Sequence, residues 1–161
     1  MEKQFIDLVN NNRALIFKVC NLYCKDHEVR KDLFQEVVLQ LWRSFPSFRR
    51  ESAVSTWIYR VALNTAITHF RKESRKQGDK SIGSIEFAIP DMSGLMDDRE
   101  NKNILYQAIQ NLTKLEKAIV MLYLDEKTYE EISAIIGISS GNVGVRLNRI
   151  KSKLGKIVKT Y

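Results

Sequence analysis

Residues 129–143 read Tyr-Glu-Glu-Ile-Ser-Ala-Ile-Ile-Gly-Ile-Ser-Ser-Gly-Asn-Val, and this stretch decides the fold of the C-terminal part of the chain. Apolar residues recur at helical spacing on both sides of Gly137, which permits the left-handed turn that ends a first helix. These positions are Ile132 and Ile136 on the inner face of the first helix, Ser133 where the helices cross, Ile138 at the corner and Val143 on the second helix. The pattern predicts a helix-turn-helix.

Capping residues mark the ends of both predicted helices. Thr128 is followed three residues later by Glu131, and this spacing predicts a capping box in which each side chain satisfies a helix-end donor. Gly137 ends the helix, and Ser139 is predicted to cap the next one.

The second helix of this motif has a basic outer face. Leu147, Ile150 and Leu154 continue its inner stripe, and the last sixteen residues of the chain hold six basic residues and no acidic ones. In a helix-turn-helix the second helix enters the major groove with its N-terminus first. The residues predicted to reach base edges are Ser140, Asn142 and Val145 or Arg146, and those predicted to meet phosphates are Arg149 and Lys153. The alternative is a helical hairpin whose charged face is only solvated.

Upstream, helical patterns also dominate, and no segment alternates as a half-buried strand would. Three helices are predicted, from about Glu2 to Cys24, from about Glu28 to Ser44, and from about Ser55 to Lys72. In the second of these, Leu33, Val37 and Leu41 repeat every four residues. Further on, four helices are predicted at about Arg99–Leu112, Lys114–Leu124, Tyr129–Ile136 and Ser140–Lys159.

Between these two groups of helices the composition changes to glycine, serine and scattered charges. We therefore predict an all-α protein of two small helical domains, residues 1–75 and 99–161, joined by a linker over residues 76–98.

Charge is also divided along the chain. The net charge is +7, and hydrophobic residues make up 44% of the 161 residues, enough for a buried core. Residues 1–75 carry thirteen basic and eight acidic residues, residues 76–127 seven and nine, and residues 128–161 six and two. Two positive ends around an acidic middle favour two separate contacts with a polyanion, although ordinary solvated helix faces are the alternative.

No apolar run approaches the roughly 20 residues that cross a bilayer, so no membrane insertion is expected. The N-terminus lacks the layout of a secretion signal, which predicts a cytoplasmic protein. Cys20 and Cys24 lie four residues apart among apolar neighbours, which favours two buried thiols over a zinc site. Neither a metal nor another cofactor is predicted.

Two blocks in the first domain point to a family. Residues 32–42 read Asp-Leu-Phe-Gln-Glu-Val-Val-Leu-Gln-Leu-Trp, and residues 48–64 read Phe-Arg-Arg-Glu-Ser-Ala-Val-Ser-Thr-Trp-Ile-Tyr-Arg-Val-Ala-Leu-Asn. With the helix-turn-helix, these blocks resemble, in order and separation, the extracytoplasmic-function sigma factors of bacterial RNA polymerase. The resemblance covers nearly the whole chain except the linker. It implies a sigma factor that binds core RNA polymerase, directs it to specific promoters and assists their melting.

The resemblance also implies roles for individual residues. The surface that docks on the clamp helices of the largest polymerase subunit would comprise Asp32, Gln35, Glu36 and Gln40, which share one polar face. The helix that meets the minus-ten element would present Trp57, Tyr59, Arg60, Asn64, Arg71 and Lys72, because bases stack on aromatic rings and phosphates pair with cations. The loop that accepts a flipped base would comprise Arg49, Glu51 and Ser52. The helix-turn-helix would read the minus-thirty-five element, with the flap of the second subunit and an anti-sigma factor as further partners.

Some side chains within these blocks have structural explanations instead. Trp57 and Tyr59 cannot share one face of a helix, so we expect Trp57 to be at least half buried, and Trp42 to be a core residue.

The sequence departs from the family pattern at Arg50, Val54, Ser133 and Gly144. A glycine inside a helix costs about 1 kcal/mol relative to alanine, and at position 144 it removes one expected DNA contact.

Two other classes of function compete with this interpretation. A stand-alone helix-turn-helix regulator would need a dimerisation or sensor domain, and neither is evident. An enzyme using Asp32 and Glu36 would need a histidine, a cysteine or a glycine-rich phosphate loop beside them, and none accompanies them. We therefore predict that the chain is not an enzyme and has no catalytic residues.

Overall fold

The computed structural model describes residues 1–50, 53–76 and 99–160, and the chain divides into two compact units, Met1–Ala88 and Ile89–Tyr161. The described residues are helical with short connections and contain no strand, so the prediction of an all-α chain with two helical domains is confirmed. The predicted linker falls almost entirely outside the described residues, and the exact limits of the two domains stay a prediction. None of the described helices combines the length and apolar character that spanning a bilayer requires.

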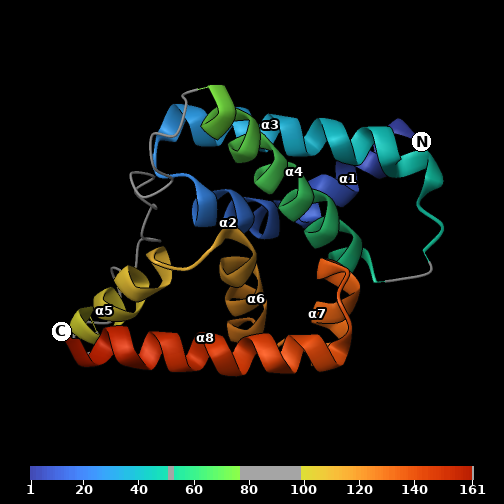
Figure 1. Cartoon of the computed structure of the whole chain (residues 1–161). Helices are drawn as coiled ribbons and strands as arrows, with labels where there is room; N and C mark the ends of the chain where they lie inside the picture. The colour runs from blue at the N-terminus through green and yellow to red at the C-terminus, as the bar shows by residue number, and fades with distance from the viewer. Residues whose placement is uncertain (51–52, 77–98, 161) are drawn as a thin grey trace. The chain divides into compact units, whose positions relative to one another are not determined.

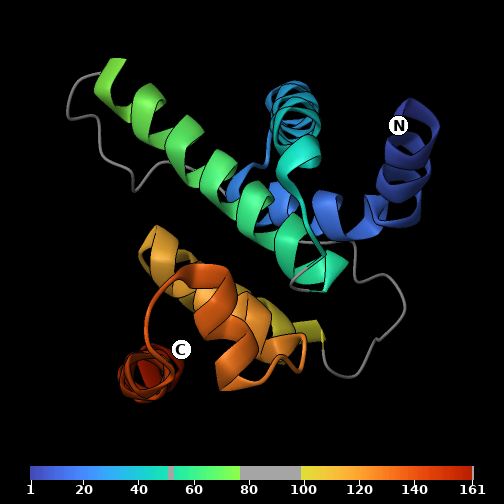
Figure 2. The ribbon, with the colours of Figure 1, turned by 90° about the vertical axis from the view of Figure 1, so that its right-hand side faces the viewer.

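The N-terminal unit contains α1 (Glu2–Asn11), α2 (Arg13–Tyr23), α3 (His27–Ser44), the short 3-10 helix η1 (Phe45–Ser47) and α4 (Val54–Lys76). Helices α2 and α3 both pack against α4, and Figure 2 looks nearly along α3 and shows α4 crossing it. Leu33, Val37 and Leu41 are fully buried, which confirms the four-residue repeat predicted for α3. Burying one such side chain stabilises the fold by roughly 1.5–3 kcal/mol.

One predicted helix is divided in two. The helix expected from Glu2 to Cys24 breaks at Asn12, whose backbone (φ −121°, ψ 19°) is not helical. The side-chain amide of Asn12 donates to the carbonyl of Leu8 over 2.8 Å, so it satisfies an acceptor at the end of α1. Three consecutive asparagines precede α2, and asparagine side chains compete with the helix for backbone hydrogen bonds. The break lets α1 and α2 pack in different directions.

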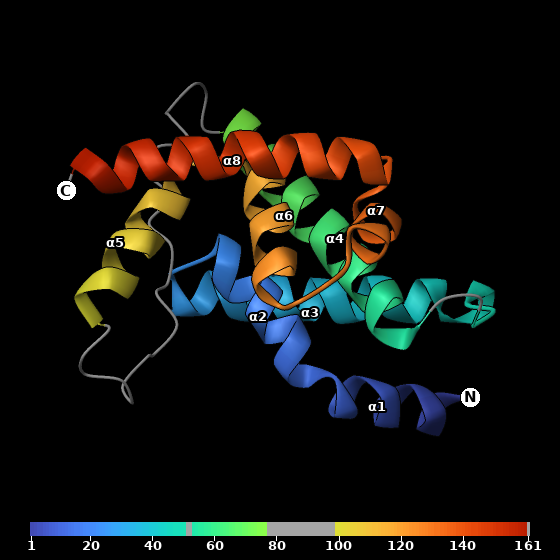
Figure 3. The same cartoon turned by 90° about the horizontal axis from the view of Figure 1, so that it is seen from below.

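The C-terminal unit contains α5 (Arg99–Gln110), α6 (Lys114–Leu124), α7 (Tyr129–Ile136) and α8 (Ser140–Thr160). Helix α8 is contacted by the other three helices, which all lie along one side of it in Figures 1 and 3. The buried side chains of Val143, Leu147 and Ile150 form the predicted inner stripe. These bounds match the predicted helices to within a residue or two, an ordinary difference at helix ends.

Helix-end chemistry fixes the turn between α7 and α8. Thr128 and Glu131 form the predicted capping box, and Gly137 adopts the left-handed conformation with φ 87°. The Ser139 hydroxyl accepts a hydrogen bond of 3.2 Å from the backbone of Asn142, as expected of a cap. One detail differs from the prediction: Ile135 is buried beside Ile132, whereas Ile136 is only partly covered.

Candidate functional site

The outward face of α8 carries the residues predicted to contact DNA. Ser140 begins the helix, and Asn142, Val145, Arg146 and Arg149 follow it with exposed side chains. Val145 is 48% exposed although it is apolar, and so it is available for contact with a base methyl group. Helix α8 is the second helix of the helix-turn-helix and directly follows its tight turn. These side chains therefore project from one rigid helix.

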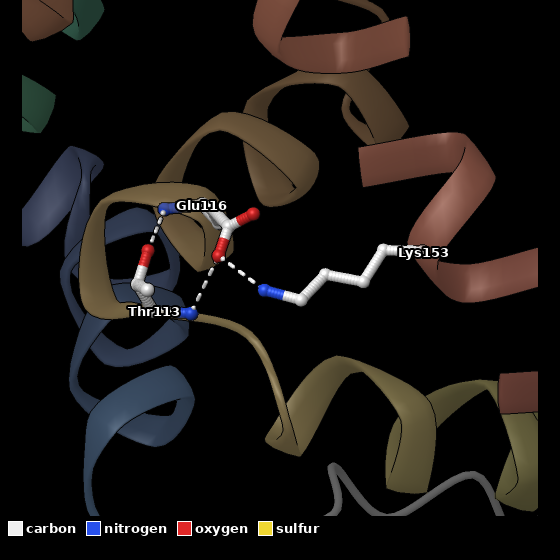
Figure 4. Close-up of polar contacts among 3 residues, drawn as sticks. All are labelled: Thr113, Glu116 and Lys153. Carbon is white, nitrogen blue, oxygen red and sulfur yellow. Dashed lines mark hydrogen bonds and ion pairs between the residues drawn. The ribbon is translucent and has the colours of Figure 1, made fainter. Parts of the chain in front are cut away.

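Lys153 lies on the same face but has a partner inside the unit. Its Nζ lies 3.1 Å from Oε1 of Glu116, near the start of α6 (Figure 4). The same carboxylate oxygen accepts a hydrogen bond of 2.9 Å from the backbone of Thr113. Glu116 and Thr113 form a second capping box, which sequence reasoning missed. Thr113 followed three residues later by Glu116 is the signal that could have revealed it.

The flank of α8 opposite Lys153 faces two tyrosines. A Cβ atom at Gly144 would lie 3.4 Å from Cε2 of Tyr129, so a side chain at this position would begin against α7. The Nζ of Lys151 lies 4.6 Å from the centre of the Tyr123 ring. A hydrogen bond with Tyr123 raises the pKa of Lys151, which remains a cation at neutral pH. The expectation that Gly144 removes a DNA contact stays a prediction.

Helix α3 presents the polar residues predicted to bind polymerase. Asp32 and Gln35 are exposed, Glu36 and Gln40 are partly exposed, and the Gln40 amide donates to Glu36 over 3.0 Å. An Asp26 cap at the start of α3 accepts hydrogen bonds from Glu28 and Val29. The four side chains thus stand on a helix with a well-defined start and a fully buried opposite face.

Two apolar side chains interrupt this polar face. Leu39 is 40% exposed and Trp42 is 42% exposed, and the Trp42 ring packs edge-on against Phe5 with centroids 5.0 Å apart. The prediction that Trp42 is a core residue is wrong, because α1 covers only part of its ring. Sequence reasoning did not select Leu39, although its position seven residues after Asp32 and four after Gln35 places it on their face.

The aromatic residues of α4 lie in the core. Trp57 is 7% exposed, which confirms that it is at least half buried, and Tyr59 is 2% exposed. Phe48 stacks on Trp57 with centroids 4.4 Å apart. Because α2, α3 and this connector together surround the start of α4, neither ring is available to a base. Tyr59, which was predicted to bind DNA, is therefore left out of the interface proposed below.

Arg60 and Asn64 remain exposed on α4, four residues apart and so on one face. Arg49 is exposed two residues after the end of η1, and Arg50 follows with a positive φ of 55°. Glu51 and Ser52 lie outside the described residues. Arg71 and Lys72 lie on α4, but their side chains are outside the described part of the structure.

The two cysteines are buried: Cys20 lies on α2, and Cys24 caps its C-terminal end. Burial raises the pKa of Cys20 to about 12, with a smaller contribution from Cys24 beside it. Burial also raises the pKa of Cys24, whose Sγ lies 3.4 Å from the carbonyl oxygen of Asp26. The prediction of two buried thiols is confirmed. Over the described ranges, no group of three His, Cys, Asp or Glu side chains is arranged to hold a metal ion.

Comparison with known proteins identifies both units. The family model Sigma-70 region 2 matches residues 8–76, and the model Sigma-70, region 4 matches residues 102–154. The ECF RNA polymerase sigma-E factor of Escherichia coli (strain K12) is 30% identical, over 95% of this chain and 85% of that protein. The protein of the same name from Haemophilus influenzae is 27% identical, over 95% of this chain and 86% of its own length.

Solved structures show the same fold. The sigma factor RpoE, crystallised with the anti-sigma factor NepR from Bartonella quintana, matches with a TM-score of 0.78 at 21% identity, over 98% of both chains. CnrH, solved with the cytosolic domain of CnrY, matches with a TM-score of 0.68 at 15% identity, over 99% of this chain and 90% of CnrH. With both family models matched in order along most of its length, this chain belongs to the ECF family of RNA polymerase sigma factors.

Proposed function

We propose that this chain binds core RNA polymerase, carries it to a specific set of promoters and assists their opening. The observation that carries the proposal is that the two units expose different kinds of helix face. One presents a helix with an acidic and amide face, and the other presents a helix-turn-helix whose second helix has an exposed arginine-bearing face. The chain supplies binding surfaces, and polymerase supplies the chemistry.

The face of α8 would read the minus-thirty-five element as duplex. Ser140, Asn142 and Val145 lie on the first two turns, which enter the major groove in a helix-turn-helix complex. Arg146 and Arg149 follow on the same exposed face and would contact base edges or phosphates. Because arginine offers two parallel donors to a phosphate or a guanine, these two positions would contribute most of the electrostatic affinity.

The face of α4 would meet the minus-ten element. Arg60 and Asn64 are exposed there, and Arg49, Glu51 and Ser52 would form the neighbouring loop that accepts an unpaired base. Arg71 and Lys72 would extend the same contact with phosphates. Because Trp57 and Tyr59 support the helix from inside, base capture would depend on this loop and on the exposed polar side chains.

The outer face of α3 would dock on the clamp helices of the largest polymerase subunit. Asp32, Gln35, Glu36 and Gln40 would pair with basic and amide groups. Leu39 and Trp42, half exposed among them, would supply the apolar anchors that interfaces need at their centre. The two apolar side chains would provide most of the affinity for polymerase. The surrounding carboxylates would orient the complex and would repel partners with acidic surfaces.

Two further partners complete the proposal. The C-terminal unit would contact the flap of the second polymerase subunit. An anti-sigma protein would regulate the chain by covering these surfaces. The similar sigma factor RpoE was crystallised with the anti-sigma factor NepR, which supports such a partner. We further propose a cytoplasmic location and no enzymatic activity of its own.

A reconstituted transcription assay tests the proposal. Purified chain and core polymerase are expected to start transcripts from a subset of fragments of genomic DNA, and core polymerase alone is not. Arg146→Glu with Arg149→Glu is expected to abolish binding to the upstream duplex but to leave polymerase binding intact. Asp32→Lys with Glu36→Lys is expected to abolish polymerase binding alone. Normal transcription by both double variants would show that these faces have been assigned wrongly.

A further inference from the structure

Helix α8 carries four cations between Arg146 and Lys153, but they do not have the same neighbours. Arg146 and Arg149 are exposed, and Lys153 lies with them on the outward face, seven and four residues further on. On periodicity alone, Lys153 is as good a phosphate ligand as Arg149. Its contact with Glu116 in α6, at 3.1 Å, distinguishes it.

Glu116 is held in place independently of the lysine. Its Oε1 accepts from the backbone of Thr113 at 2.9 Å, while its own backbone donates to the Thr113 hydroxyl at 3.2 Å (Figure 4). Its side chain is 17% exposed, against 45% for Lys153. The carboxylate of Glu116 is therefore the fixed member of the pair, and the more exposed Lys153 side chain extends to it.

We propose that Glu116 is a positioning residue for DNA binding, which holds Lys153 against α6 and so removes it from the phosphate contacts of α8. This inference rests on the proposed function of the α8 face. Lys153 can bind a phosphate only by leaving a carboxylate that is mostly covered and that would then lose one of its two donors. The negative charge of Glu116 also repels a phosphate that approaches the lysine. Within the part of the chain that the structure describes, no carboxylate is paired with Arg146 or Arg149.

The protonation of Glu116 agrees with this geometry. Burial raises its pKa, but the hydrogen bonds from Thr113 and Lys153 outweigh that effect, and the pKa is lowered overall. Glu116 is therefore ionised at neutral pH, where it can retain the lysine.

The test measures how DNA binding depends on salt. Full-length chain is titrated onto a fluorescein-labelled, mixed-sequence 30-base-pair duplex by fluorescence anisotropy between 50 and 200 mM KCl. Each phosphate contact contributes a slope of about −0.9 to the logarithm of affinity against the logarithm of salt. One added contact therefore causes about a 3.5-fold greater loss of affinity across this range.

Four variants separate the possibilities. Glu116→Gln keeps an oxygen that can accept from Thr113 but releases Lys153, and the slope should become steeper by about one phosphate contact. Lys153→Gln alone should change the slope by less than half as much as Arg149→Gln. Glu116→Gln combined with Lys153→Gln should return the slope to that of the wild type. Glu126→Gln removes an exposed acid of the same unit and should leave the slope unchanged, which controls for net charge.

Equal slope changes for Lys153→Gln and Arg149→Gln would overturn the inference while leaving the DNA-binding face intact. Unchanged slopes for Arg146→Gln and Arg149→Gln would instead reject the proposed face itself. A readout without DNA checks the pair directly. The pKa of Glu116, followed by carboxyl 13C NMR in the full-length chain, should rise in Lys153→Gln, and an unchanged pKa would also reject the pairing.

Discussion

Gly144 gives a prediction that joins helix propensity, packing and DNA binding at one position. Replacing it with alanine should stabilise the C-terminal unit, because glycine inside a helix costs about 0.5–1 kcal/mol relative to alanine. The new methyl group would lie 3.4 and 3.8 Å from two ring carbons of Tyr129, which is ordinary van der Waals contact. Stabilisation should therefore reach about 0.5–1 kcal/mol, or a rise in melting temperature of about 2–8 °C for a unit of this size.

The assay has to report on the C-terminal unit. Both tryptophans, Trp42 and Trp57, belong to the other unit, so urea unfolding is best followed by far-UV circular dichroism. Gly155→Ala is the matched control, since it lies on the same helix with nothing within 4 Å of a Cβ. It should show the gain from helix propensity without the contact to Tyr129.

Two results would refute the reasoning about Gly144. If Gly144→Ala lowers the unfolding midpoint while Gly155→Ala raises it, Tyr129 cannot accommodate the methyl group. If Gly144→Ala changes the affinity for duplex DNA by more than about twofold, a difference of about 0.4 kcal/mol, position 144 belongs to the DNA-binding face. Stabilisation with unchanged affinity is the expected outcome.

Three other changes test the capping box, the buried thiols and the docking helix. Thr128→Ala should destabilise the C-terminal unit by about 0.5–2 kcal/mol, since Glu131 loses its partner, and a normal urea midpoint would contradict this. Cys20 and Cys24 should react with Ellman's reagent at pH 8 only after unfolding. The pKa of the Cys20 thiol is near 9.0 in the unfolded chain and about 12 in the folded one. Its contribution to stability is therefore complete below pH 9 and is lost as the pH rises from 9 toward 12. Rapid labelling of the folded protein would show that the two thiols are not buried. Trp42→Ala should weaken binding to core polymerase by about tenfold, measured by competition, and unchanged binding would remove Trp42 from the proposed docking surface.

The helices could be predicted from the sequence because their signals are local. The capping box at Thr128, the glycine at 137 and the four-residue repeat from Leu33 each depend on residues within one or two turns. The break at Asn12 was missed because the apolar residues before and after it follow one continuous helical spacing. What interrupts the helix is the hydrogen-bonding preference of asparagine, which hydrophobic periodicity does not record.

The exposure of single side chains was harder to predict, because it depends on neighbours that are distant in the sequence. Tyr59 is buried since two helices and the Phe48 connector surround the start of α4. Trp42 is half exposed since α1 reaches only one edge of its ring. Periodicity places a residue on a face of its own helix, but it does not say how far the next helix extends over that face.

The cations of α8 show what the tertiary structure adds to composition. Lys151 lies over the Tyr123 ring on one flank of the helix, and Lys153 reaches Glu116 on the opposite flank. Arg146 and Arg149 lie on the same side of the helix as Lys153, seven and four residues before it, and their side chains are exposed. The two lysines therefore contact side chains of α6, whereas the two arginines are exposed. Arginine suits that position, because its planar group can donate two hydrogen bonds to one phosphate or one guanine, whereas a lysine acts as a point charge.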